Sequence, residues 1–372
     1  MRHRQFAATL PRTLPRTLPR TLPRTLPRTL ATSLATTLLA ALVFAAPASY
    51  AQVAGVAQGG PVAPQARGIV VEDSLYSPSL GVSKKFIVYL PRSYARESAR
   101  RYPVAFYLHG MGGTERSWVV GLAIDSVLDS LITGGMPEMI VVMPDGDNGF
   151  YHSWRTSPNY EKCLRKRAIL FGGELPTDYC VRRMRYDDYI AHDLVARVDS
   201  IYRTVADGGH RAVAGLSMGG YGAVYLPLKY PDVFAAGASL SGAGLALMRV
   251  GGYPDATPVR EATTIDELHA AWASTWPGIT EELGADIAGW RAVDPVWMVR
   301  RAVADHRPLP ALWFVVGTED ESTLAVNRVL HETLAQLGVP HSYAEVAGGH
   351  TGALWRAHEG ESLVWVASII GH

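Results

Sequence analysis

The chain has little cysteine and no long uninterrupted apolar run. Only two of its 372 residues are cysteines, and neither belongs to a CxxC pair or a histidine-rich cluster, the patterns typical of a zinc site. The strongly apolar run at about 34–46 is shorter than the ~20 residues that a membrane-spanning helix needs, and threonines interrupt it. We therefore expect no bound metal, no cofactor and no stable membrane span.

The first 51 residues contain no acidic residue. They carry seven arginines, and Thr-Leu-Pro-Arg is repeated five times over residues 9–28. Proline at every fourth position excludes a helix there, so this stretch is low-complexity sequence. A basic start, an apolar segment and small residues at Ser49 and Ala51 are typical of a secretory signal peptide. Residues 1–51 therefore predict a secreted or periplasmic protein.

The charge of the remaining chain is mildly acidic. Removing the seven arginines of residues 1–51 changes the formal net charge from +1 to −6. Because nucleic-acid phosphates require a basic face, this charge argues against a nucleic-acid partner. Residues 52–67 are rich in Ala, Gly, Pro and Gln and predict a flexible lead-in. No second core is evident after it, so residues 68–372 are predicted to form one domain, and the sequence indicates no oligomeric state.

Short apolar runs alternate with helical patterns along residues 68–372. Strands alternating with helices predict an α/β fold with a mostly parallel sheet covered on both faces, and the first two runs predict an antiparallel start. Two stretches, 155–185 and 243–310, interrupt this alternation of strands and helices. We expect both to lie over the strand ends that hold the reactive residues. The expected strands are 69–75, 85–90, 104–108, 139–143, 212–216, 235–240, 312–316 and 342–346, and the expected helices are about 117–133, 187–202, 221–230, 323–337 and 353–369.

Ser217 lies in Gly-Leu-Ser-Met-Gly-Gly, between a short apolar run and a helical pattern. A serine in Gly-x-Ser-x-Gly sits on a tight strand-to-helix turn where larger neighbours would clash, and the strain leaves its hydroxyl exposed above the sheet. Such short patterns also occur by chance, but this one has the flanking strand and helix that the turn requires. Ser217 is therefore the predicted nucleophile.

A serine hydroxyl needs an imidazole to take its proton and a carboxylate to orient that imidazole. In α/β enzymes with this turn the chain order is serine, acid, histidine. The strand at 312–316 is followed by three adjacent carboxylates, of which Asp320 is our choice and Glu319 the alternative; acidic residues at a helix start are the structural alternative. His350 follows a later strand through two glycines and is the predicted base, whereas His331 and His358 fall in predicted helices.

An oxyanion hole needs backbone N–H donors aimed at the developing negative charge. Met218, directly after the serine, supplies one donor. The turn after the strand at 104–108 contains glycines that allow close approach, and Met111 in that turn is the predicted second donor. His109 is expected to hold the turn, because its position in the chain order is wrong for the base.

Taken in order, these motifs resemble the esterase branch of the α/β hydrolases that includes S-formylglutathione hydrolase (esterase D), feruloyl esterases and mycobacterial mycolyltransferases. The resemblance covers most of residues 70–370. It implies Ser217 as nucleophile, Asp320 as acid, His350 as base, and the amides of Met111 and Met218 as oxyanion donors. The matching motifs are Tyr89-Leu90-Pro91, Leu108 to Gly113 with Trp118, Pro144-Asp145-Gly146, Gly215 to Gly220, Gly317 to Asp320, and Gly348 to His350.

The segment from Trp154 to Tyr186 departs from that family, whose members run quickly into the next helix. It contains both cysteines, and in an exported chain two nearby cysteines more often form a bridge than remain free. We therefore predict a Cys163–Cys180 disulfide, with a reactive cysteine or metal pair as the minor alternative. Between Lys162 and Arg185 the insertion also carries seven lysines and arginines, and it is a hypothetical lid or, equally, a solvated surface loop.

Three aromatic residues are candidate substrate contacts. Tyr151 and Trp154 could line a pocket for an aromatic or sugar group, and Trp355 could support His350 or touch substrate, although aromatic residues in loops often only pack. The sequence as a whole predicts an exported serine esterase acting on feruloyl, acetyl or aliphatic esters. An acyltransferase using the same residues is the main alternative, and a non-catalytic carbohydrate or envelope binding module is the second.

Overall fold

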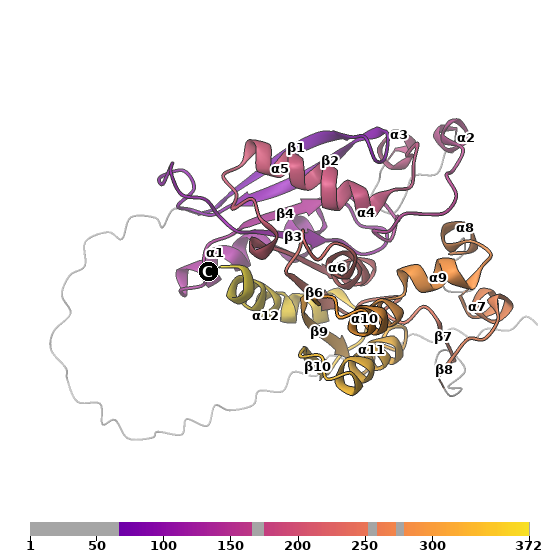
Figure 1. The fold of residues 1–372 in the computed structure, drawn as a ribbon. Coiled ribbons are helices and arrows are strands. Elements are labelled where there is room, and N and C mark those ends of the chain that lie inside the picture. Colours follow the sequence, from indigo (N-terminus) through magenta and orange to yellow (C-terminus); the bar gives the residue numbers. More distant parts are fainter. Residues whose placement is uncertain (1–66, 166–174, 252–258, 273–278, 372) are drawn as a thin grey trace, which may run out of the picture. The chain divides into compact units, whose positions relative to one another are not determined.

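An eight-stranded sheet runs through the described part of the chain, in the order β1-β2-β4-β3-β5-β6-β9-β10 (Figure 1). The structure, a computed structural model, describes residues 67–165, 175–251, 259–272 and 279–371. The predicted signal peptide at 1–51 and nearly all of the predicted lead-in at 52–67 lie outside these residues. The strands are β1 (Ile69–Ser77), β2 (Val82–Leu90), β3 (Val104–Leu108), β4 (Ile140–Pro144), β5 (Arg211–Leu216), β6 (Ala236–Leu240), β9 (Ala311–Gly317) and β10 (Ser342–Val346).

The sheet begins antiparallel and continues parallel. β1 pairs with β2, and β2 with β4, in antiparallel fashion, whereas every pairing from β4 to β10 is parallel. Leu108, the last residue of β3, is opposite Gly215 in β5, so the turns that follow these two strands emerge side by side. The predicted mostly parallel sheet with an antiparallel start is confirmed.

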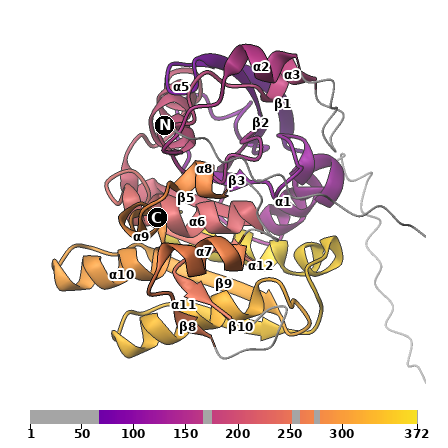
Figure 2. The same ribbon diagram turned by 90° about the vertical axis from the view of Figure 1, so that its right-hand side faces the viewer.

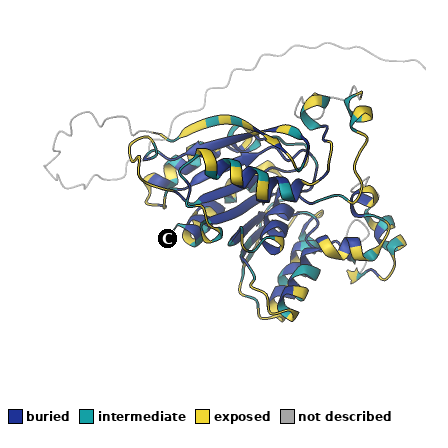
Figure 3. Cartoon of the chain, turned by 45° about the horizontal axis from the view of Figure 1, so that its top comes forward, coloured by how far each residue is buried: buried dark blue, intermediate teal, exposed yellow. Residues whose placement is uncertain are grey.

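Helices cover both faces of the sheet. The central strands are buried along their whole length, as Figure 3 shows, because side chains alternate between two apolar clusters on opposite faces. The helices α1 (Ile124–Thr133) and α12 (Gly352–Ile370) pack on one face. The other face carries α5 (Val195–Ile201), α6 (Met218–Lys229), α10 (Pro295–Ala304) and α11 (Leu324–Gln336). Among the described helices, none is long and apolar enough to cross a membrane.

Two expected helices are interrupted, and one starts early. The segment expected at 117–133 divides into a π-helical turn, η1 (Ser117–Gly121), and α1, because Ala123 between them takes a left-handed φ of 59°. The segment expected at 187–202 is a composite of α4 (Tyr186–Asp188), a π-helical η2 (Tyr189–Leu194) and α5. Helix α6 begins at Met218, three residues before its expected start, because the serine turn leads directly into it.

The stretch at 243–310 contains regular structure instead of a long loop. Its described residues form β7 (Arg249–Val250), β8 (Arg260–Glu261), α7 (Ile265–Trp272), α8 (Ile279–Leu283), α9 (Ile287–Val293) and α10. Helices α7 and α8 contact each other on the side of the molecule that is at the right in Figure 1 and faces the viewer in Figure 2, while α10 packs against α6 and α11. The expectation that this whole stretch lies over the strand ends is therefore wrong for α10, which belongs to the layer that covers the sheet.

The predicted disulfide is present. Cys163 and Cys180 are bonded, with their Cα atoms 5.8 Å apart, and the described residues contain no free cysteine. The bond joins two short helices of the insertion, α2 (Tyr160–Leu164) and α3 (Pro176–Tyr179), neither of which has a buried residue. Because apolar burial contributes so little here, the covalent link is the main constraint that holds α3 next to α2.

Glu359, in the middle of α12, is a buried carboxyl group without a hydrogen-bond partner among the described residues. It is 1% exposed, and neither side-chain oxygen has a partner. Burial raises the pKa of Glu359 to about 7, although Arg356 nearby opposes the shift. Between pH 4.5 and 7 the unfolded chain therefore loses this proton while the folded chain keeps it, so the free energy of unfolding falls as pH rises.

We expect Glu359→Gln to remove that pH dependence. Relative to the parent protein, its free energy of unfolding should increase by about 2 kcal/mol between pH 5 and pH 8, because one pKa unit corresponds to about 1.4 kcal/mol. Urea unfolding at both pH values measures the difference. Glu281→Gln, at an exposed carboxylate of α8, is the control and should change by less than about 0.5 kcal/mol. Equal pH slopes for the Glu359→Gln variant and the parent would contradict the prediction.

Candidate active site

Ser217 lies between β5 and α6 in a strained backbone conformation. Its φ is 53° and its ψ is −117°, a combination that a residue with a side chain rarely adopts. Neighbouring glycines make the turn possible: a Cβ atom on Gly215 would lie 2.3 Å from the backbone oxygen of Gly219, and one on Gly219 would lie 2.2 Å from that of Leu108. The strain holds the Ser217 side chain, which is only partly buried, at the end of the strand where Gly-x-Ser-x-Gly predicts it.

Ser217, His350 and Asp320 form one continuous hydrogen-bonded line. The Nε2 atom of His350 lies 2.8 Å from the Ser217 hydroxyl oxygen, and its Nδ1 atom lies 2.8 Å from Oδ2 of Asp320. The His350 side chain is 29% exposed, whereas the Asp320 side chain is fully buried. The structure thus brings together three residues that are 30 and 133 positions apart along the chain.

Asp320 is held by more than the histidine. Its carboxylate accepts hydrogen bonds from the Ser322 hydroxyl at 2.7 Å, and from the amide and hydroxyl of Thr323 at 3.0 and 2.7 Å. Burial by itself would raise the pKa of Asp320, but the hydrogen bonds from His350, Thr323 and Ser322 outweigh it and lower the pKa to about 2. Glu319, the alternative acid, is exposed. The geometry therefore favours Asp320 as the partner of the imidazole.

The turn after β3 and the start of α6 present the two predicted oxyanion donors. Met218 is the first residue of α6, where backbone N–H groups have no acceptor within the helix. Met111 lies between Gly110 and Gly112 in the β3 turn, and a Cβ atom on Gly110 would approach that of Ser217 to 3.3 Å. Gly112 takes a φ of 76°, and its N–H donates to Oδ1 of Asn148 at 2.7 Å.

His109 supports this turn. Its Nδ1 atom bonds to the Gly110 carbonyl oxygen at 2.8 Å, and its Nε2 atom accepts from the N–H of Gly146 at 2.9 Å. The ring is buried, and it is the amide donor at Nε2 that places the proton on Nδ1. Both ring nitrogens are therefore used for structure, as the chain order indicates.

The three predicted substrate-contact residues have different environments. Tyr151 is fully buried, and its hydroxyl donates to the His109 carbonyl oxygen at 3.0 Å, so the expected substrate contact is wrong for this residue: it has no surface left to offer. Trp154 is partly buried against the core and donates to the Gly149 carbonyl oxygen at 3.2 Å. Trp355 packs edge-on against His350, with ring centres 5.0 Å apart, which is the supporting role considered for it.

The sequence motifs leave out a buried charged cluster beside the β3 turn. Lys84, Asp145 and Asp147 are all buried and in ion-pair contact. Lys84 occupies an inward-facing position of β2, in phase with the buried Phe86 and Val88, and this misplaced charge in the alternating pattern is the signal that could have found it. Asn148 carries no such signal, since its role depends entirely on a tertiary contact. No group of three or more potential metal ligands occurs within the described residues.

The strand order, the helices on both faces and the strained serine between β5 and α6 define the chain as an α/β hydrolase. Comparison with known families gives the narrower assignment. The chain belongs to the family described as "Putative esterase", whose model matches residues 77–358.

Individual relatives are more distant. Esterase Rv1288 of Mycobacterium tuberculosis (strain ATCC 25618 / H37Rv) is 29% identical over 282 residues, which cover 71% of this chain and 51% of that protein. This chain thus spans about half the length of that mycobacterial relative. An endo-1,4-beta-xylanase/feruloyl esterase of Xylanibacter ruminicola is 29% identical over 181 residues, 47% of this chain and 22% of that protein.

Solved structures share the fold. A ferulic acid esterase superposes with a TM-score of 0.58 at 24% identity, covering 82% of this chain and 99% of that one. An S-formylglutathione hydrolase from Agrobacterium tumefaciens gives a TM-score of 0.60 at 19% identity, covering 82% and 97%. At such identities the likeness shows the fold alone.

We expect Gly219→Ala to destabilise the protein by at least about 3 kcal/mol, because the new Cβ atom would meet backbone at 2.2 Å and backbone cannot move aside cheaply. Gly360→Ala in α12 is the matched control. There the nearest atoms are side-chain carbons at 3.8 and 4.0 Å, and alanine should stabilise the helix by about 0.5–1 kcal/mol. Thermal and urea unfolding measure both; a Gly219→Ala variant as stable as the parent would refute the close-approach explanation.

Proposed function

We propose that the protein is an exported serine esterase that hydrolyses carboxylic esters through an acyl-enzyme. The observation that carries this proposal is the line from the Ser217 hydroxyl through His350 to the buried Asp320, with both links at 2.8 Å. This is the arrangement that turns a weakly nucleophilic hydroxyl into an attacking group. Membership of the esterase family supports the same reaction class.

In the proposed reaction the oxygen of Ser217 attacks the ester carbonyl while Nε2 of His350 takes its proton. Asp320 holds the Nδ1–H of the imidazole and stabilises the imidazolium that forms. The amides of Met218 and Met111 stabilise the negative charge on the former carbonyl oxygen. His350 then protonates the departing alcohol, and water, activated by the same imidazole, attacks the acyl-enzyme and releases the acid.

Export is supported by two features of the chain. Residues 1–51 have the basic, apolar and small-residue sections of a signal peptide. The Cys163–Cys180 disulfide suits an oxidising compartment, because thiols are kept reduced in the cytosol. We therefore assign the reaction to the periplasm or the outside of the cell.

For the substrate we propose esters attached to carbohydrate, carrying a feruloyl or acetyl group. Curated proteins that match this chain include the endo-1,4-beta-xylanase/feruloyl esterase and an acetyl esterase of Caldicellulosiruptor saccharolyticus, the latter at 19% identity. An exported enzyme would meet polymers in its surroundings rather than intracellular thioesters, which favours the same class.

Ser217→Ala should abolish turnover on a panel of p-nitrophenyl acetate, longer p-nitrophenyl esters and methyl ferulate, with kcat lowered by more than about 10⁴-fold. It should also prevent labelling by a fluorophosphonate, since no nucleophile remains. Ser200→Ala, at an exposed serine of α5, is the control and should behave as the parent. Equal rates for the Ser217→Ala variant and the parent would refute the assigned nucleophile, and a new ester formed from added alcohol would indicate acyl transfer.

Asp320→Asn and Glu319→Gln separate the two candidate acids. We expect Asp320→Asn to lower kcat by about 10³–10⁴-fold, because an amide in place of the carboxylate no longer stabilises the imidazolium. Glu319→Gln should retain nearly full activity, since Glu319 is exposed and Asp320 alone is bonded to His350. Steady-state kinetics on p-nitrophenyl acetate measure both; the opposite ranking would reassign the acid.

A further inference from the structure

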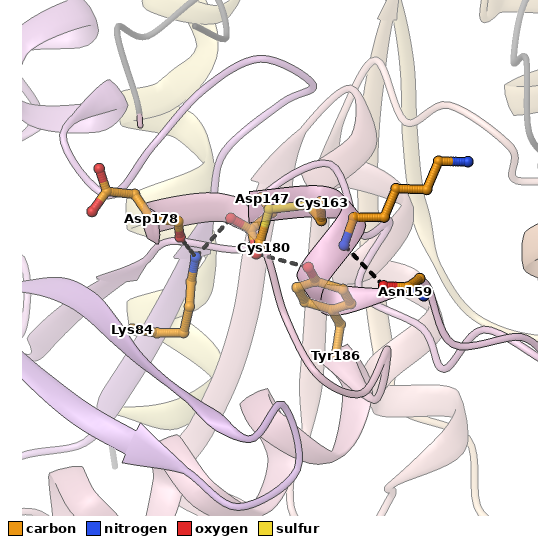
Figure 4. The surroundings of a disulfide bond; sticks show 8 residues. Lys84, Asp147, Asn159, Cys163, Asp178, Cys180 and Tyr186 are labelled. Carbon is orange, nitrogen blue, oxygen red and sulfur yellow. Dashed lines mark hydrogen bonds and ion pairs between the residues drawn. A yellow bond between two sulfur atoms is a disulfide. The ribbon is translucent and has the colours of Figure 1, made fainter. Parts of the chain in front are cut away.

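Lys84 on β2 connects three parts of the chain from inside the protein. Its side chain is fully buried, and its Nζ atom contacts the Asp145 carboxylate. Figure 4 shows its two other contacts: the Nζ atom lies 2.6 Å from Oδ1 of Asp147 and donates to the backbone oxygen of Asp178 at 2.8 Å. Lysine is almost never fully buried unless its charge is paired. Here two carboxylates from the loop after β4 and one carbonyl from α3 satisfy it.

The loop that Lys84 holds is strained. Asp147, Phe150 and Tyr151 all take left-handed φ angles, of 48°, 51° and 55°. Residues in this region persist only where their surroundings over-determine them. Asp147 is held from two sides, because Lys84 contacts Oδ1 and the Tyr186 hydroxyl donates to Oδ2 at 2.7 Å. Burial raises the pKa of Asp147 to about 6, and the charge of Lys84 opposes this rise. The ionised form of Asp147 therefore depends on Lys84.

The same loop fixes the turn that contains Met111. The N–H of Gly146 donates to His109 at the start of that turn at 2.9 Å, and Oδ1 of Asn148 accepts from the N–H of Gly112 at its end at 2.7 Å. Met111 lies between these two attachment points. The direction of its amide therefore follows the position of the loop.

The third contact of Lys84 leads to the disulfide. Asp178 belongs to α3, two residues before Cys180, whose bond to Cys163 ties α3 to α2 (Figure 4). Cys180, directly after α3, is buried, and the N–H groups of Arg182 and Arg183 donate to the Leu80 carbonyl oxygen. The end of α3 is therefore held at the β1–β2 turn by contacts of its own, and the disulfide adds a link to α2.

We propose that Lys84 is a positioning residue for the oxyanion donor of Met111. The proposal rests on the esterase function proposed above. Lys84 touches no reacting atom; it sets the loop from Asp145 to Tyr151, and the loop sets the β3 turn. Loss of the lysine should weaken stabilisation of the transition state while leaving substrate binding nearly intact.

The first test compares Lys84→Met with Lys85→Met. Lys85 is the adjacent lysine on the outer face of β2; its side chain is 61% exposed and lies 3.4 Å from the side chain of the same Asp178. Rates on p-nitrophenyl acetate are expressed per active site titrated with a fluorophosphonate, so that misfolded protein does not count. Lys84→Met should lower kcat by about 10- to 100-fold with KM within about twofold of the parent, because a donor displaced by about 1 Å loses that much. Lys85→Met should match the parent.

A trifluoromethyl ketone separates positioning from a general loss of order. Ser217 adds to its carbonyl carbon, and the oxygen that becomes negative occupies the oxyanion hole. Its inhibition constant should rise in proportion to the fall in kcat/KM in the Lys84→Met variant, while that of a ground-state competitor, the product acid, stays unchanged. Equal kcat per titrated site and equal ketone affinity in the Lys84→Met and Lys85→Met variants would overturn the proposal.

If the Lys84→Met variant does not fold, Asn148→Ala tests the connection between the loop and the β3 turn. Asn148 is only partly buried, and its loss should lower kcat and ketone affinity together. Wild-type values for Asn148→Ala would refute the connection between loop and turn. A parent protein that hydrolyses none of the esters would instead refute the esterase function itself.

Discussion

The backbone of Leu108, at the end of β3, passes that of Gly219 with no room for a side chain between them. The two strands β3 and β5 are neighbours in register, so their turns must leave the sheet within a few ångströms of each other. This close approach requires glycine at 215 and 219 and holds Ser217 at a positive φ. It also places the first amide of α6 next to the turn of Met111. Ser217, the helix after it and the neighbourhood of Met218 and Met111, the proposed oxyanion donors, therefore depend on a single backbone contact.

Charge is arranged around that contact in two separate groups with different tasks. Asp320 is buried, and its hydrogen bonds outweigh the effect of burial and lower its pKa to about 2. This keeps a negative charge next to His350. On the other side of the serine, Lys84 and two carboxylates hold the loop that supports the β3 turn. His109 and Asp145 stand in motifs that look reactive, yet their polar atoms are occupied by structural contacts. Titratable residues within these sequence motifs thus differ in their contacts, which separate the proposed catalytic groups from the structural ones.

Local patterns predicted the strands of the eight-stranded sheet closely, since β3 and β10 have the expected bounds and the others in that sheet differ by a few residues at the ends, whereas the short β7 and β8 were not predicted. Helix interiors were predictable for the same reason: an apolar face repeats at a fixed spacing whatever the element packs against. The breaks at Ala123 and within 186–201 were not, because left-handed and π-helical turns carry no apolar period of their own. The packing of α10 beside α6 likewise arises from contacts between segments far apart in the chain.

The sequence by itself determined the fold class, the serine turn and the order of serine, acid and histidine, because each depends only on residue types and on their spacing along the chain. Residue type and spacing left Asp320 and Glu319 as equivalent candidates for the acid. Only the tertiary structure separates them, because it buries the Asp320 carboxylate against His350 and exposes Glu319 to solvent. Tyr151 was a candidate for lining a pocket, with packing as the alternative, and it is buried with its hydroxyl bonded to the His109 carbonyl oxygen. Lys84 and Asn148 acquired their roles only through folding. Which side chain faces a site depends on what packs behind it, and a linear pattern does not contain that information.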